Sequence, residues 1–166
     1  MITAAIILAE AAAMYENLNA VQTQTYGPEA RGGSSRSEVI IADTPILFPK
    51  VIQPNVLVCL TQEAYNKFHP LIRPGGTLLS DARYVNTLKK VDAYRVELPM
   101  YKTVMEKINN SIVFNICMLG AVIELMGHVK PESVMKVLES RMPPASLEMN
   151  RKALELGIDL ASPFKR

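Results

Sequence analysis

Apolar residues follow two patterns along the chain: short apolar runs and longer stretches with a helical period. In the first long stretch, residues 3–16, a stripe formed by Ile2, Ile6, Ala9 and Ala13 predicts a helix. The short apolar runs, of which Val39-Ile40-Ile41 is the most β-branched, predict strands, which we place at residues 20–24, 37–42, 55–60, 77–80 and 92–98. The other periodic stretches predict helices at residues 62–68, 100–108, 111–127, 131–141 and 146–160.

The alternation of buried strands with helices predicts the fold class. Strands interleaved with helices indicate an α/β protein, a three-layer α/β/α sandwich with a mostly parallel sheet and a helical C-terminal part. Ligands of such sheets gather at the carboxyl ends of the strands. One such end is the junction at Thr61, which is placed to cap the helix at 62–68. Met100 and Tyr101 follow the strand at 92–98 and could line the same crevice, although core packing is the simpler role for both.

Length, charge and hydropathy exclude several classes of protein. The 166 residues contain no repeat or linker and suit a single domain. The net charge of +2, without a Lys/Arg block, argues against nucleic acid or an anionic membrane as partner. Residues 1–13 lack the basic start of a signal peptide, and the apolar run at 112–126 is interrupted by Asn115 and Glu124. We therefore expect a cytoplasmic protein without a membrane span.

The two cysteines, Cys59 and Cys117, lie inside apolar runs and far apart in sequence. Neither has a second Cys or a His at metal-ligand spacing, and an iron–sulfur cluster needs four thiolates. This chain cannot supply such a ligand set by itself, and we expect no metal site in it. Both cysteines are typical of small buried side chains in a reducing compartment.

The most polar chemistry lies between two predicted strands, in residues 23–41. A Gly-Pro pair starts a turn, and Gly32 and Gly33 allow close approach of the backbone. With three serines and the guanidinium groups of Arg31 and Arg36, this stretch offers many hydrogen-bond donors to an anion, a phosphate or a partner's carboxylate. The alternative interpretation is a solvated connection with ordinary surface ion pairs.

The same residues carry a family resemblance. Tyr-Gly-Pro-Glu-Ala-Arg-Gly-Gly-Ser-Ser-Arg-Ser-Glu-Val, residues 26–39, resembles the signature of the gamma subunit of 2-oxoacid:ferredoxin oxidoreductases, most nearly the 2-oxoglutarate type. The likeness continues in order through nearly the whole chain, at residues 53–58, 61–65, 74–79, 115–120 and 150–157. It implies a Rossmann-like fold, as in domain III of pyruvate-ferredoxin oxidoreductase.

The resemblance implies a role inside a larger enzyme. Such complexes decarboxylate a 2-oxoacid oxidatively to an acyl-CoA and reduce ferredoxin, using thiamine diphosphate, Mg²⁺ and 4Fe–4S clusters. The sequence has no Gly-Asp-Gly thiamine motif and no cysteine cluster. Those duties would belong to alpha, beta and delta-type partner subunits. The gamma chain would hold no catalytic residue and no cofactor alone, and would form a wall near the coenzyme A site.

Carrying the family motif over position by position gives a set of candidate binding residues. We expect the functional set to be Tyr26, Gly27, Glu29, Arg31, Gly32, Gly33, Ser34 and Asn115. Arg31 is the first choice for contact with an anion or a partner's carboxylate, because its planar fork suits both. Glu29 could instead pair with a base of a neighbouring subunit. Asn115, on a buried apolar helix, must find a hydrogen-bond partner, so a structural role and a ligand role are equally expected.

The start of the chain departs from the family pattern. A strand and a Gly-x-Gly-Gly-Gln-Gly loop should precede the first helix, whereas this sequence opens on the helix itself. A start site assigned too late, a trimmed chain and a subunit that never had the loop are the three explanations. We favour a missing N-terminus and expect the native protein to be longer by about 20 residues, the size of a strand and its loop. Two alternatives stay open: a gamma subunit for pyruvate or another 2-oxoacid, or, in a different class, a standalone nucleotide- or coenzyme-A-binding module or a structural interaction protein.

Overall fold

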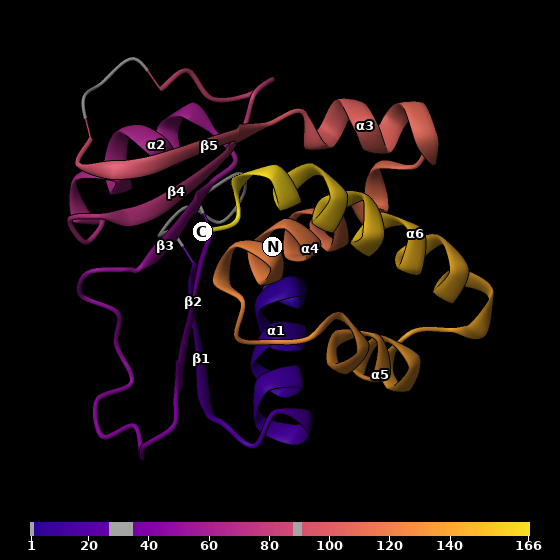
Figure 1. Ribbon diagram of the computed structural model, residues 1–166, viewed down its shortest axis with the longest axis horizontal. Helices are drawn as coiled ribbons and strands as arrows, with labels where there is room; N and C mark the ends of the chain where they lie inside the picture. The colour runs from indigo at the N-terminus through magenta and orange to yellow at the C-terminus, as the bar shows by residue number, and fades with distance from the viewer. Residues whose placement is uncertain (1, 27–34, 88–90) are drawn as a thin grey trace.

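The computed structural model describes residues 2–26, 35–87 and 91–166 (Figure 1). The helices are α1 (Ile2–Tyr15), α2 (Gln62–Phe68), α3 (Met100–Lys107), α4 (Phe114–Met126), α5 (Pro131–Arg141) and α6 (Pro144–Ala161). The strands are β1 (Asn19–Tyr26), β2 (Ser35–Ala42), β3 (Val56–Cys59), β4 (Gly76–Asp81) and β5 (Ala93–Leu98). All of the predicted elements are present, with boundaries shifted by a few residues at most.

The five strands form two separate sheets within the described residues. Strands β3, β4 and β5 lie side by side in parallel, with Cys59 opposite Ser80 and Asp81 opposite Leu98. Strands β1 and β2 instead form an antiparallel hairpin from Asn19 opposite Ala42 to Tyr26 opposite Ser35. The hairpin packs against α1, and its apolar side chains join the core on that side.

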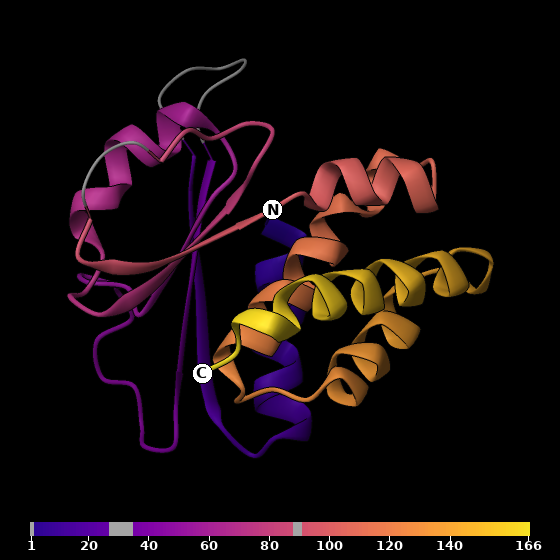
Figure 2. The ribbon, with the colours of Figure 1, turned by 45° about the horizontal axis from the view of Figure 1, so that its top comes forward.

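The parallel sheet has helices on both faces, which confirms the predicted α/β class. Adjacent residues of β4 point to opposite faces, as the period of two requires. Leu78 joins a cluster with Tyr65 of α2, whereas Leu79 joins the large core formed with α1 and α4. Figure 2 shows α2 on one side of the molecule and the helices α3–α6 on the other.

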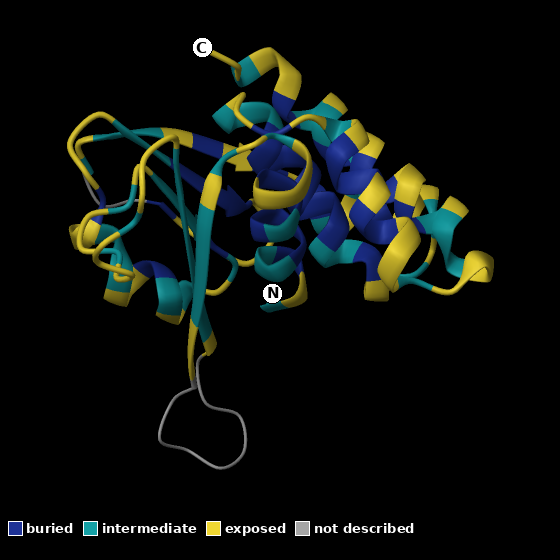
Figure 3. Ribbon diagram, turned by 90° about the horizontal axis from the view of Figure 1, so that it is seen from below, coloured by how far each residue is buried: buried dark blue, intermediate teal, exposed yellow. Residues whose placement is uncertain are grey.

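Helix α4 lies at the centre of the helical half, and every residue from Ile116 to Ile123 is buried (Figure 3). It packs most extensively against α6, where Gly120 and Gly157 allow the two backbones to meet. The predicted stripe of α1 was wrong in part: Ala9 is buried, but Ile2 and Ile6 are only half-buried and Ala13 is exposed. The fully buried side of the helix includes Ala4, Ile7 and Ala11. Among the described residues, no helix is long and apolar enough to cross a membrane.

Candidate functional site

The hairpin β1–β2 carries the predicted binding loop at its end. Tyr26 closes the ladder opposite Ser35. Gly27, Glu29, Arg31, Gly32, Gly33 and Ser34 lie outside the described residues. Their assignment as binding residues therefore stays a prediction.

The described flank of this loop is held by polar contacts. The Arg36 guanidinium pairs with the Glu38 carboxylate, and it also lies 5.2 Å from the ring centroid of Phe68 on α2. Glu38 accepts a second hydrogen bond from the backbone N–H of Val51, at 3.2 Å. Across the hairpin, the Gln22 amide donates to the Ser37 hydroxyl at 2.8 Å. Arg36 thus fits the interpretation of an ordinary ion pair, and it ties the hairpin to α2.

Asn115 is the second residue of α4 and lies half-buried in its first turn. The Oδ1 atom of its amide is buried and accepts no hydrogen bond from the described residues. The internal partner that the structural role requires is therefore missing from this part of the chain. Its neighbour Phe114 contacts Tyr101, which brings Asn115 to the end of the molecule where the strands of the parallel sheet terminate.

Asp81 organises this carboxyl edge of the sheet. It is the last residue of β4, its side chain is fully buried, and its two carboxylate oxygens bind different segments. One oxygen accepts from the backbone N–H of Arg83 at 2.9 Å, and the other accepts from that of Tyr101 at 2.8 Å. Because Tyr101 lies in the first turn of α3, the carboxylate also meets the positive end of that helix. Asp81 therefore fixes the loop after β4 against the start of α3.

Three aromatic rings and one arginine are assembled on this frame. The rings of Tyr84 and Tyr101 meet edge to face with centroids 5.4 Å apart, and Tyr101 and Phe114 meet in the same way at 5.6 Å. The guanidinium carbon of Arg83 lies 4.8 Å from the Tyr101 centroid and 5.5 Å from that of Tyr84. Such cation–π contacts hold a guanidinium in place while its N–H groups stay free to donate.

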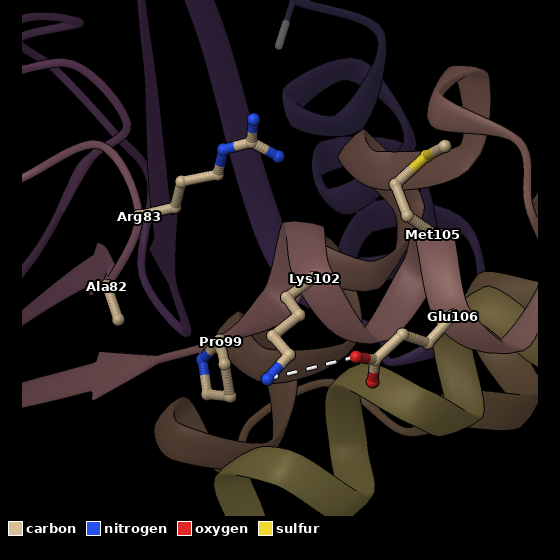
Figure 4. Close-up of a pocket in the computed structure, with 6 residues that line it drawn as sticks. All are labelled: Ala82, Arg83, Pro99, Lys102, Met105 and Glu106. Carbon is tan, nitrogen blue, oxygen red and sulfur yellow. Dashed lines mark ion pairs between the residues drawn. The ribbon is translucent and has the colours of Figure 1, made fainter.

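Two open depressions adjoin Arg83 at the loop after β4, and both are lined in part by Ala82 and Arg83. The first, about 480 Å³, is lined by Ala82, Arg83, Pro99, Lys102, Met105 and Glu106 (Figure 4). The second, about 380 Å³, is lined by Gln62, Ala82, Arg83, Tyr84, Val85, Asn86 and Glu97. Of the two crevice candidates, Tyr101 belongs to this edge, whereas Met100 is fully buried in the core.

Comparison with known proteins assigns the chain to a family. The family model described as pyruvate ferredoxin/flavodoxin oxidoreductase matches residues 1–160. The chain belongs to this family. It is 47% identical to the 2-oxoglutarate synthase subunit KorC of Methanocaldococcus jannaschii, an alignment that covers 97% of this chain and 87% of that relative.

Solved structures of the oxidoreductase family share the fold. The gamma subunit of a keto/oxoacid ferredoxin oxidoreductase from Geobacter sulfurreducens is 40% identical, with a TM-score of 0.84 over 96% of this chain and 90% of that one. A 2-oxoglutarate:ferredoxin oxidoreductase from Magnetococcus marinus, solved with 2-oxoglutarate, coenzyme A and succinyl-CoA, has a TM-score of 0.87 at 21% identity. That match covers 97% of this chain and 28% of the other, and it shows the shared fold alone.

The two cysteines of this family member are buried free thiols. Burial raises the pKa of Cys59 to about 11. Burial, together with the negative charge of Asp81, raises the pKa of Cys117 to about 12. Both thiols are therefore protonated at neutral pH. Among the described residues, no three or more His, Cys, Asp or Glu side chains lie close enough together to hold a metal ion.

Sequence reasoning missed Asp81 and Arg83. A signal for both was present, because they directly follow a predicted buried strand of a parallel sheet, where ligands gather. Charged residues in that position are candidates for ligand contact for the same reason as the Thr61 junction. The sequence prediction instead favoured the glycine-rich loop.

Proposed function

We propose that this chain is the gamma subunit of a multi-subunit 2-oxoglutarate:ferredoxin oxidoreductase. The complex would convert 2-oxoglutarate and coenzyme A into succinyl-CoA and CO₂, and pass the two electrons to two oxidised ferredoxins with release of one proton. The observation that carries this proposal is the 47% identity to a 2-oxoglutarate synthase subunit over 97% of the chain. The 40% identical gamma subunit of a keto/oxoacid ferredoxin oxidoreductase supports the subunit type.

The proposal leaves the redox chemistry to partner subunits. A 4Fe–4S cluster takes four thiolates, whereas this sequence has two cysteines, both buried and protonated at neutral pH. We assign the clusters, thiamine diphosphate and Mg²⁺ to alpha, beta and delta-type subunits, and the final transfer to ferredoxin to the complex as a whole. The two free thiols also fit the reducing cytoplasm, where we place the complex.

The gamma chain would supply the wall of the coenzyme A site. Tyr26, Gly27, Glu29, Arg31, Gly32, Gly33 and Ser34 are the proposed contacts, because they match the family signature. Asn115 joins them as the polar residue on α4 whose side-chain oxygen has no partner in the described chain. Arg31 would bind an anionic group of the ligand, since a guanidinium matches phosphate with two parallel hydrogen bonds.

The proposal is tested by anaerobic affinity purification of the tagged chain from its native host. The eluate is assayed for coenzyme-A-dependent reduction of a viologen dye with 2-oxoglutarate and, in parallel, with pyruvate. We expect iron–sulfur and thiamine-binding subunits to copurify, with activity on 2-oxoglutarate. Activity on pyruvate alone would reassign the substrate. A well-folded, colourless and inactive chain without partners would refute the proposed function and favour a standalone binding module.

The loop is tested in the assembled complex. We expect Arg31→Ala to raise the KM for coenzyme A about tenfold or more, the effect of losing a charge-assisted hydrogen bond. The KM for 2-oxoglutarate should stay unchanged. Weakened assembly with unaltered kinetics would instead assign Arg31 to a subunit interface.

A further inference from the structure

Most of the charged side chains at the carboxyl edge of the parallel sheet have a polar partner. Glu106 pairs with Lys102 at 3.8 Å, and Glu97 accepts a hydrogen bond from the Thr87 hydroxyl. Asp81 uses both carboxylate oxygens on backbone N–H groups. Arg83 forms no ion pair with any carboxylate of the described residues, and Figure 4 shows its guanidinium pointing away from Glu106. The Arg83 guanidinium, which adjoins both depressions, is thus without a carboxylate partner in the described part of the chain.

This guanidinium is preorganised before any ligand arrives. Asp81 accepts a hydrogen bond from the backbone N–H of Arg83, and the rings of Tyr84 and Tyr101 contact the Arg83 guanidinium. Arg83 nevertheless remains exposed to solvent. A side chain already fixed in this way loses less conformational freedom on binding, so more of the interaction appears as affinity.

The surroundings indicate the kind of anion. The first depression is lined by the apolar side chains of Ala82, Pro99 and Met105 and by the paired charges of Lys102 and Glu106. In the second depression, Gln62 and Asn86 offer polar groups. An extended ligand that carries phosphate groups and a chain with both methylene and amide groups would match this mixed lining, and coenzyme A has that construction.

We propose that Arg83 is an anion anchor that binds a phosphate group of coenzyme A at the carboxyl edge of the sheet. This inference rests on the proposed function and adds to it a contact outside the glycine-rich loop. Tyr84 and Tyr101 are positioning residues, because they affect ligand binding only by holding the Arg83 guanidinium in place.

The test uses the assembled complex and measures coenzyme A binding by anaerobic calorimetry, with no 2-oxoacid present. We expect Arg83→Ala to raise the Kd for coenzyme A about tenfold or more, because a charge-assisted contact is lost. Arg83→Lys keeps the positive charge but not the planar, forked guanidinium. Its Kd for coenzyme A should fall between those of Arg83→Ala and the wild type. Arg73→Ala is the matched control: Arg73 is equally exposed but precedes β4 at the opposite edge of the sheet, and its loss should change the Kd by less than about twofold.

Dephospho-coenzyme A identifies the phosphate. If Arg83 binds the 3′-phosphate, Arg83→Ala will weaken coenzyme A but not the dephospho form, whereas contact with the diphosphate weakens both. A wild-type Kd for inorganic phosphate as low as that for coenzyme A would overturn the choice of ligand.

Other outcomes separate this inference from the proposed function. A wild-type complex with no coenzyme-A-dependent activity refutes both. A wild-type complex that is active, with Arg83→Ala binding coenzyme A as tightly as the wild type, overturns the Arg83 anchor alone. If Arg83→Ala fails to assemble, Arg83→Lys decides, because wild-type affinity in that variant would show that the fork makes no ligand contact.

Discussion

The crossing of α4 and α6 depends on two glycines, and replacing one of them tests the packing of the helical half. A Cβ atom added at Gly157 would lie 1.8 Å from the backbone oxygen of Cys117 and 2.9 Å from the backbone nitrogen of Ala121. At Gly120 the added atom would lie 2.1 Å from the backbone oxygen of Leu154. Since an ordinary contact begins near 3.4 Å, Gly157→Ala requires the helices to separate by about 1.6 Å.

The magnitude follows from two opposing effects. Overpacking in a well-packed core costs about 1–3 kcal/mol, and the upper end applies because the obstructing atoms belong to the backbone and cannot rotate away. Alanine gains about 1 kcal/mol over glycine in a helix. We therefore expect Gly157→Ala to lower the free energy of unfolding by about 2 kcal/mol, and the Tm by about 4–8 °C for a chain of this size.

The assay is urea and thermal unfolding of the purified chain, followed by circular dichroism. Gly127→Ala is the control, because Gly127 has φ +69° at the end of α4 and free space around it. Its expected cost of about 1 kcal/mol comes from the left-handed backbone alone. The pair Gly120→Ala and Gly157→Ala should be less than additive, since one separation of the helices relieves both contacts. A Gly157→Ala protein as stable as the wild type would refute the close crossing.

Three further predictions test other parts of the structure. Asp81→Asn should destabilise the chain by about 2 kcal/mol in urea unfolding, because one amide oxygen cannot accept from both Arg83 and Tyr101; wild-type stability would contradict the tie between β4 and α3. The hydrogen bond from the Ser133 side chain and that from the backbone of Lys130 lower the pKa of Glu16. The contribution of Glu16 to the free energy of unfolding is therefore complete above the unfolded pKa near 4.5, and it is lost as the pH falls through the folded pKa. The stability difference between the wild type and Glu16→Gln should thus shrink below about pH 4.5, and a difference that grows in acid would reverse this sign. Cys59 and Cys117 should resist a thiol-specific reagent at pH 8 and both react after denaturation, because burial raises both pKa values; rapid labelling of the native chain would show that the thiols are accessible.

The sequence predicted the order and type of the elements because the chain signals them locally. The short apolar runs at residues 55–60 and 77–80 became the parallel strands β3 and β4, and the apolar stretch at 111–127 became the buried helix α4. Thr61 caps α2 as expected, with its hydroxyl accepting from the backbone N–H of Ala64 at 3.1 Å. These features depend on neighbours within a few residues, so they can be predicted from the sequence alone.

Only the tertiary structure decided which surfaces meet. Helix α1 is apolar on nearly all sides, so its period could not tell which side faces the core; the hairpin and α5, packed against it, settled this. The Asp81 carboxylate joins segments 20 residues apart in sequence, and the contact of Phe114 with Tyr101 brings Asn115 to the same edge. The sequence by itself determined the elements, the family and the candidate loop. The lack of a carboxylate partner for Arg83 became visible only after folding, because it depends on where the carboxylates of three other segments find their partners.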